Sequence, residues 1–377
     1  MKDNPYREFI PIVVIGAGQA GLSLSYHLSQ RGLTHVVLER DRPFASWYER
    51  WDSFRVNTPN WMNTLPGLDD RVMPGRTSDG FATKEELLRY LERYVSVVDP
   101  PLETGVDVQE VSEQPEGRWL VRTNGTDNLC DNVVICTGAM SNPYVPPVAS
   151  QIPSRVPQLH SKSYRNPEQI STSSVLIVGS GSSGVQICKD LYHSQRFNHI
   201  HFATSNVTVL PRHVFGIQVH RFLHSFRLFD IRMSSLLGKL LYSQLEMKGD
   251  PIVRPSARDL GKQYGVHVYG RLNGVEGSRL LFSDGRGLDI TNLSVIWCTG
   301  FRPDYNWVEV NEGKRLLDSS GYPLHHRGVA TEVAGLFFVG LRHQHTAASH
   351  DFYGVGDDAA YVADRIYART QAASPAT

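Results

Sequence analysis

Residues 12–21, near the amino terminus, constrain the fold of this chain more than any other segment. They begin with four β-branched apolar residues, Ile12 to Ile15, which are typical of a parallel strand buried on both faces. Gly16, Gly18 and Gly21 follow with the spacing Gly-x-Gly-x-x-Gly, and residues 22–30 carry apolar residues at helical spacing. The segment predicts a strand, a tight turn and a helix whose first N–H groups face a pyrophosphate.

The next predicted strand supports the same interpretation. Residues 36–38 are apolar and lead into Glu39, which stands 18 residues after Gly21. A carboxylate at this position can bind the hydroxyl groups of a ribose, and it repels a 2′-phosphate. Together these elements predict a dinucleotide site. The alternative is an ordinary turn between a strand and a helix that happens to use glycines.

The same design occurs a second time in the chain. Residues 175–178 form an apolar run before Gly179, Gly181 and Gly184, about 160 residues after the first run. Proline and serine are frequent between residues 142 and 157, as in a linker, and 377 residues are enough for two domains. We therefore expect an α/β fold with two dinucleotide-binding, Rossmann-like domains.

The strand after the second glycine turn ends in a different way from the first. It reaches Thr204 with neither an acid nor an arginine at its end, and the next cation is Arg212. Because an arginine normally binds the 2′-phosphate of NADPH, this predicts relaxed selectivity between NADH and NADPH. Residues 215–247 are rich in apolar side chains, which favours either a substrate lid or a packed helical insertion.

The composition argues against several kinds of partner. Lys+Arg and Asp+Glu both number 38, so the zero net charge gives no reason to expect a nucleic acid. No apolar run approaches the ~20 residues of a membrane-spanning helix, and residues 1–9 lack the apolar core of a signal peptide. We expect a cytoplasmic protein with no membrane partner. The four cysteines are too few and scattered for a disulfide framework, and we expect no metal site.

These motifs, in this order, resemble the flavin-containing monooxygenases, and more closely their small soluble bacterial members and the plant auxin-forming enzymes. The resemblance covers nearly the whole chain. It implies an FAD-binding domain made of residues 1–154 and 296–377, with an NAD(P)H-binding domain inserted at residues 155–295. Residues 215–247 would form a helical insertion within the inserted domain.

The resemblance also implies which residues hold the cofactors, FAD and either NADPH or NADH. Thr137-Gly138 and the segment from Thr299 to Asp304 look like the family's two Thr-Gly crossover segments, where the domains join. The family's Gly-Gly-x-Trp sequence is replaced here by Ala45-Ser46-Trp47. The implied cofactor-binding residues are Gly16, Gly18, Gln19, Ala20, Gly21, Glu39, Arg40, Trp47, Thr137, Gly138, Gly179, Gly181, Ser182, Ser183, Gly184, Thr204, Arg212, Thr299, Gly300, Asp304 and Gly356.

Asn57 resembles the family's active-site asparagine, which lies beside the flavin and the nicotinamide. The implied reaction is that NAD(P)H reduces FAD, O2 adds to form a flavin C4a-hydroperoxide, and a small nitrogen, sulfur or carbonyl compound is oxygenated. An amide would supply a fixed hydrogen-bond donor in a dry pocket. The alternative role for Asn57 is that of a turn residue, since it precedes Thr58-Pro59.

Other functions remain open at this point. A pyridine nucleotide–disulfide oxidoreductase needs a close cysteine pair, but Cys130 and Cys136 would lie about 20 Å apart along an extended strand, against the roughly 7 Å that a disulfide allows. An NAD(P)H oxidase without oxygen transfer and a non-catalytic redox-sensing flavoprotein are further alternatives. The expected partners are a small-molecule substrate and O2, with a homodimer left open.

Overall fold

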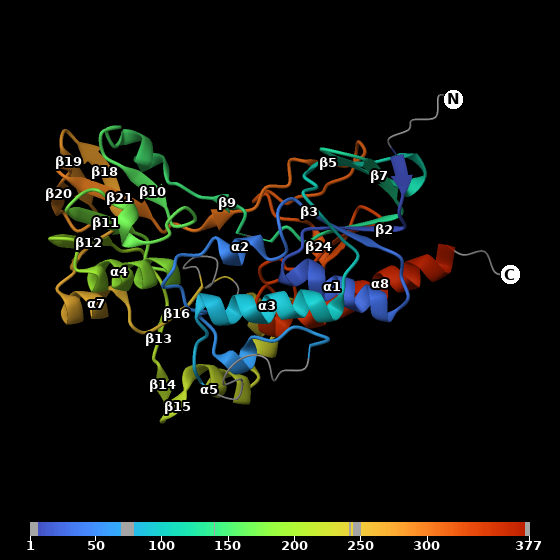
Figure 1. Ribbon diagram of the computed structural model, residues 1–377, viewed down its shortest axis with the longest axis horizontal. Helices are drawn as coiled ribbons and strands as arrows, with labels where there is room; N and C mark the ends of the chain where they lie inside the picture. Colours follow the sequence, from blue (N-terminus) through green and yellow to red (C-terminus); the bar gives the residue numbers. More distant parts are fainter. Residues whose placement is uncertain (1–6, 69–78, 139, 241–242, 244–249, 374–377) are drawn as a thin grey trace.

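The two glycine-rich segments lie in two separate α/β domains of the structure, a computed structural model that describes residues 7–68, 79–138, 140–240, 243 and 250–373. Figure 1 shows the first domain at the right, with both chain ends, and the second domain at the left. The first domain is built from the two ends of the chain, and the second is inserted between them. The predicted α/β class and two-domain organisation are confirmed.

The strand that begins the first glycine-rich segment lies inside a seven-stranded sheet with the order β24-β25-β26-β8-β2-β3-β4. It pairs in parallel with both neighbours, so that Val13 lies opposite Val36 on one side and Val133 on the other. The strands are β2 (Ile12–Ile15), β3 (Val36–Glu39), β4 (Leu102–Thr104), β8 (Asn132–Ile135), β24 (His325–His326), β25 (Val329–Ala330) and β26 (Leu336–Phe338).

This sheet is covered on both faces, which explains why its strands are apolar without alternation. Ile12 and Val14 pack toward the helices α1 (Gln19–Gln30), α3 (Lys84–Val98) and α8 (Phe352–Ala373). Val13 and Ile15 pack into a separate core under a second sheet. That sheet has the order β1-β7-β6-β5-β23, with β1 (Arg7–Phe9), β7 (Asp127–Cys130), β6 (Trp119–Thr123), β5 (Val108–Glu113) and β23 (Val308–Glu309).

The second domain repeats this plan. Its five-stranded parallel sheet has the order β10-β21-β11-β12-β17, with helices on one face and a three-stranded antiparallel sheet on the other. The parallel strands are β10 (Gln158–His160), β21 (Leu293–Trp297), β11 (Ser174–Val178), β12 (His199–Ala203) and β17 (His267–Tyr269). The helices are α4 (Ser182–Ser194) and α7 (Ala257–Tyr264), and the antiparallel strands are β18 (Leu272–Glu276), β19 (Arg279–Phe282) and β20 (Gly287–Asp289).

The chain crosses between the domains at two places that lie side by side. The outgoing strand β9 (Asn142–Pro143) pairs antiparallel with the returning strand β22 (Phe301–Arg302). The core of the second domain already includes Ala149, which lies within the short 3-10 helix η4 (Pro147–Gln151), and it extends to Trp297 at the end of β21. In the structure, the second domain thus extends slightly beyond the predicted boundaries at 155 and 295.

The predicted helical insertion is divided into short elements, seen below the sheets in Figure 1. Within residues 215–247 they are β15 (Ile217–Gln218), α5 (Val219–Ser225) and η6 (Leu228–Asp230), with helical residues at 236–240. The short strands β13 (Val209–Leu210) and β14 (His213–Val214) precede this segment, and β16 (Ile252–Val253) follows it. Residues 241–242 and 244–249 lie outside the described part of the chain. Several apolar side chains here are exposed, including Phe215 at 94% and Leu236 at 88%.

The insertion also contacts the first domain. The Met233 N–H donates to the carbonyl of His345 at 2.8 Å, and Arg232 forms a backbone bridge with Thr346. These contacts place the insertion against the loop that follows β26 in the first domain.

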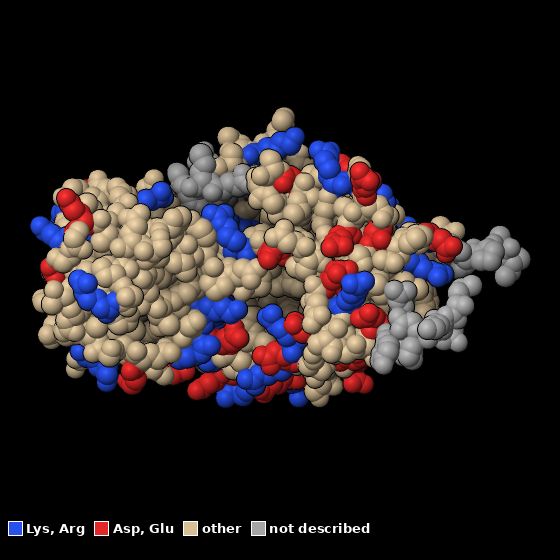
Figure 2. All heavy atoms as spheres, turned by 90° about the horizontal axis from the view of Figure 1, so that it is seen from above, with Lys and Arg blue, Asp and Glu red and all other residues tan. Residues whose placement is uncertain are grey.

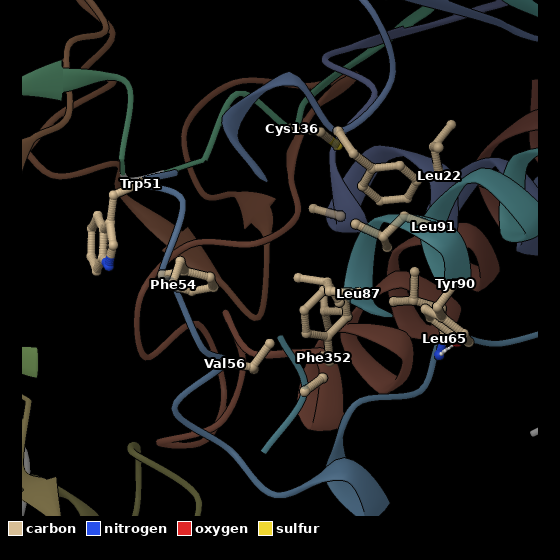
Figure 3. Packing of buried hydrophobic residues seen from close by; sticks show 14 of the residues in the cluster. Leu22, Trp51, Phe54, Val56, Leu65, Leu87, Tyr90, Leu91, Cys136 and Phe352 are labelled. Carbon is tan, nitrogen blue, oxygen red and sulfur yellow. Dashed lines mark hydrogen bonds between the residues drawn. The ribbon is translucent and has the colours of Figure 1, made fainter. Parts of the chain in front are cut away.

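The aromatic-rich segment after β3 belongs to the main core. It contains α2 (Ala45–Tyr48) and η1 (Asn60–Met62), and it buries Trp51, Phe54 and Val56. Figure 3 shows these three side chains along one loop, with Phe54 and Val56 toward Phe352 and Leu87 of α3, and Trp51 farther away. Among the described residues, no helix is long and apolar enough to cross a bilayer.

Candidate functional site

In the first glycine turn, packing requires two of the glycines, and the third faces open space. Gly16 has a φ of +103°, and a Cβ there would lie 2.8 Å from the carbonyl oxygen of Cys136. A Cβ at Gly21 would overlap the carbonyl oxygen of Gly16. By contrast, a Cβ at Gly18 would meet no heavy atom within 4 Å. Packing thus demands Gly16 and Gly21, whereas the space beside Gly18 suits a ligand approaching the backbone.

The second turn has the same geometry. Gly179 has a φ of +113°, and a Cβ there would overlap the carbonyl of Cys298; a Cβ at Gly184 would overlap the carbonyl of Gly179. A Cβ at Gly181 would again meet nothing within 4 Å. Two turns in one chain therefore have an open central glycine.

The helices that follow both turns start without a side-chain cap. Gly18 and Gly181 are the N-cap residues of α1 and α4, and neither helix has an acid in its first turn. The first residues of these helices are the predicted pairs Gln19-Ala20 and Ser182-Ser183. Uncapped N–H groups and the helix dipole favour a phosphate at each start. Two residues after α2, the buried Nε of Arg50 also has no hydrogen-bond acceptor within the described structure. These features fit two bound dinucleotides.

The two turns differ beside their second strands. Glu39 lies at the end of β3 and accepts hydrogen bonds from the Ala17 N–H at 2.8 Å and the Asp41 N–H at 3.0 Å, so its carboxylate stands at the first turn. At the second turn the equivalent link is uncharged, because the Ser180 hydroxyl accepts from the Ser205 N–H at 2.8 Å. Arg40, next to Glu39, is exposed.

The predicted nicotinamide-selectivity residues lie near this second strand end. The Thr204 hydroxyl donates to the carbonyl of Tyr269 at 2.8 Å. Arg212 donates from Nη2 to the carbonyl of Arg254 at 3.3 Å. Burial and the nearby charge of Arg212 lower the pKa of Lys189 on α4. Arg212 therefore lies close to the helix that starts at the second turn.

The predicted contact residues Gln19 and Trp47 hold protein elements together. Trp47 donates from Nε1 to Gln19 Oε1 at 3.0 Å, and Gln19 donates from Nε2 to the carbonyl of His350 at 2.9 Å. Trp47 also stacks on Phe352, with ring centroids 5.3 Å apart. Their polar groups thus fix α2 and the start of α8 around the start of α1.

The two Thr-Gly segments lie where the domains join. Thr137-Gly138 follows β8, and Thr299-Gly300 follows β21, the strands next to β2 and β11. The Thr299 hydroxyl donates to the carbonyl of Tyr144 at 2.5 Å. His160 accepts from the Lys162 N–H at Nδ1, so Nε2 carries the proton and donates to the carbonyl of Gly300 at 3.1 Å.

Two predicted residues lie away from the glycine turns. Asp304 is exposed after β22 and accepts from the Asn306 N–H at 3.0 Å, which makes it a turn residue in this structure. Gly356 lies inside α8, where a Cβ would contact the Pro66 ring at 3.4 Å.

A hollow lies at the domain junction. It is lined by residues from α2, the crossover segments and the turn after β10, and Figure 2 shows blue Lys and Arg side chains beside a depression between the domains. Lys162 lies at this pocket and donates to the carbonyl of Ser141 at 3.0 Å. The lining residues are Ser46, Glu49, Arg50, Met140, Ser161, Lys162 and Phe301.

Asn57 is exposed on the loop of the first domain that faces α4 of the second. Its side-chain oxygen Oδ1 accepts a hydrogen bond from Gln186 Nε2 at 2.8 Å. The predicted active-site amide therefore stands against the helix that begins at the second glycine turn.

The polar loop after β26 was not predicted from the sequence. Its residue His343 is buried with a φ of +58°, and burial lowers the pKa of its imidazole. Arg342 pairs with Asp250 at 2.6 Å, and burial raises the pKa of Asp351. The position of this loop directly after an apolar strand could have indicated it, since side chains after a parallel strand lie at the edge of the sheet where ligands bind.

The four cysteines are free and buried, and burial raises the pKa of each thiol. Buried thiols of raised pKa are poor nucleophiles, which argues against a dithiol redox centre. Among the described residues, no group of three or more His, Cys, Asp or Glu could hold a metal ion.

Comparisons with known proteins agree with the two-domain fold. A family model described as pyridine nucleotide-disulphide oxidoreductase matches residues 13–212. An uncharacterized CzcO-like oxidoreductase of Geobacillus kaustophilus is 31% identical over 96% of this chain and 99% of its own length. The probable indole-3-pyruvate monooxygenase YUCCA1 of Arabidopsis thaliana is 27% identical over 82% of this chain and 80% of its own. The solved flavin-containing monooxygenase from Stenotrophomonas maltophilia has a TM-score of 0.74 and 25% identity, covering 96% of this chain and 99% of that one.

Proposed function

This chain belongs to the flavin-containing monooxygenases, within the wider pyridine nucleotide-disulphide oxidoreductase family, and from that premise we propose that it uses FAD, NAD(P)H and O2 to oxygenate a small molecule. FAD would bind at the first glycine turn, beside Gly18 and Glu39, and the nicotinamide nucleotide at the second, beside Gly181. The substrate class is a nucleophilic nitrogen or sulfur compound, or a carbonyl compound.

One observation carries the proposal. The amide of Asn57, on the first domain, lies 2.8 Å from a side chain of α4, the helix that starts at the second glycine turn. A residue in this position can contact ligands held by both turns. When bound, FAD and the nicotinamide nucleotide supply the transfer of electrons to O2, and the protein supplies orientation and exclusion of water. Asn57 would supply a fixed hydrogen-bond donor there.

The test is to measure bound FAD per chain, and then the oxygenated product formed per NAD(P)H oxidised with a thioether, an amine and a ketone. Product with any one of them, in proportion to nucleotide oxidised, is expected. Steady NAD(P)H consumption that yields only hydrogen peroxide with every substrate would favour the oxidase alternative. Nucleotide binding without turnover would favour the redox sensor.

A second test concerns the nicotinamide nucleotide. The side chains at this strand end are the uncharged Ser180, Thr204 and Ser205. None of them is an acid that would repel a 2′-phosphate or an arginine that would bind it. Neutral donors bind a phosphate about half as strongly as charged ones. We therefore expect kcat/KM for NADPH to exceed that for NADH by less than about 10²-fold, or ~2.7 kcal/mol.

Arg212 provides a check on this expectation, because it is a cation near α4 that follows the second strand of this site. If NADPH is preferred by more than 10²-fold, Arg212→Ala should abolish the preference while leaving kcat/KM for NADH unchanged. A strict preference that survives this substitution would mean that another group binds the 2′-phosphate. The cytoplasmic location and the homodimer remain predictions.

A further inference from the structure

Gln186 joins the two domains through its side-chain amide. It lies in the second turn of α4 and reaches the backbone of Arg55 in the first domain. The Arg55 N–H donates to Gln186 Oε1 at 3.1 Å, and Gln186 Nε2 donates to the Arg55 carbonyl at 2.9 Å. The same Nε2 donates to Asn57 Oδ1 at 2.8 Å.

These contacts determine which way each amide points. The two ends of an amide side chain differ only in the hydrogen bonds they make, so its orientation is set by the network around it. The Arg55 N–H can only donate and its carbonyl can only accept, so Gln186 must present Oε1 to the first and Nε2 to the second. Since Nε2 is also the end that faces Asn57, Asn57 must present its oxygen.

We infer that Gln186 is a positioning residue that holds the Asn57 carboxamide with its NH2 group available to a ligand. Within the described structure, that NH2 group has no hydrogen-bond acceptor, and Asn57 is exposed. The inference rests on the proposed role of Asn57 as a donor. It adds that the donor is fixed by a residue of the other domain, so the amide is oriented only when the two domains are correctly placed.

Two substitutions separate this role from a simple link between the domains. Gln186→Met keeps the side-chain length and removes all three hydrogen bonds, which leaves Asn57 free to rotate. Gln186→Glu keeps an acceptor for the Arg55 N–H but offers only oxygens to Asn57, so Asn57 should turn its NH2 group toward Glu and its oxygen toward the ligand. A linking role alone predicts that flavin reduction and oxygen transfer fall together in both variants, because each variant loses the hydrogen bond to the Arg55 carbonyl.

The first measurement is oxygenated product per NAD(P)H oxidised in the FAD-loaded protein. We expect a loss of several-fold in Gln186→Met and of more than tenfold in Gln186→Glu. Gln195→Glu adds the same charge at the exposed far end of the same helix and should leave the ratio unchanged. Equal ratios in the wild type and in both variants at position 186, or a smaller loss in Gln186→Glu than in Gln186→Met, would overturn the inference.

The second measurement does not depend on activity. In protein labelled with ¹⁵N-asparagine, the Asn57 side-chain NH2 signals, assigned by their loss in Asn57→Leu, should shift when NADP⁺ is added to the wild type. In Gln186→Glu the shift should be much smaller, because the NH2 group is held against Glu. An equal shift in both proteins would contradict the inference. If the NH2 signals shift in the wild type but not in Gln186→Glu, and the wild type nevertheless forms no oxygenated product, the proposed function fails while the positioning role stands.

Discussion

Gly18→Val is expected to give a folded protein that purifies without the yellow colour of FAD. The backbone at Gly18 is extended, with φ −81° and ψ −171°, which valine adopts readily, and its Cβ would meet no atom of the chain. The side chain would instead fill the space in which a pyrophosphate approaches the turn. The measurements are flavin absorbance per chain and the thermal unfolding temperature. We expect the flavin absorbance to fall by more than tenfold. The unfolding temperature should differ little from that of the cofactor-free wild type.

Two matched variants make this prediction specific. Gly181→Val changes the equivalent glycine of the second turn and should retain FAD while losing affinity for the nicotinamide nucleotide. Gly21→Val places its side chain against the carbonyl of Gly16 and should lower stability, with or without cofactor. Full FAD occupancy in Gly18→Val would refute the assignment of FAD to the first turn.

Asn57→Leu is expected to keep FAD and to be reduced by NAD(P)H at the wild-type rate, yet to lose most of its oxygen transfer. Leucine has a similar size but no hydrogen-bond donor, and losing one preorganised donor typically costs about 10²-fold in rate, or roughly 2.7 kcal/mol. The measurement is product formed per NAD(P)H oxidised, with the missing electrons appearing as hydrogen peroxide. The rate of flavin reduction in the same variant is the internal control.

A turn role for Asn57 predicts a different pattern. Loss of a turn residue would lower the unfolding temperature and affect reduction and oxygen transfer together. An unchanged yield of product in Asn57→Leu would remove Asn57 from the active site, and the positioning role of Gln186 would then have no catalytic meaning.

The sequence was sufficient to predict the fold where one physical requirement dominates. The glycines at 16 and 21 are forced by contacts with neighbouring backbone, and the apolar runs at 12–15 and 175–178 are buried on both faces. The spacing of Thr83 and Glu86 is also decided locally, because the two residues form a capping box at the start of α3, with hydrogen bonds of 3.2 and 2.8 Å.

The features that could not be predicted from the sequence depend on contacts between distant parts of the chain. Gln186 looks like any polar residue of an amphipathic helix until α4 is placed against the loop at Arg55. The buried His343 lies on the loop after β26, and only the sheet order brings that strand next to β8. The insertion reads as helical by its apolar content, whereas its chain is divided and exposes Phe215 and Leu236.

The pairing of β9 with β22 has a consequence for how such a protein can be rebuilt. Asn142 lies opposite Arg302 on antiparallel neighbours, so the chain leaves the first domain and re-enters it at almost the same point. Antiparallel neighbours can be joined by a two-residue turn. The second domain is therefore a cassette with adjacent ends, and exchanging it between related chains requires two junctions at one position rather than a redesign of the remaining sheet.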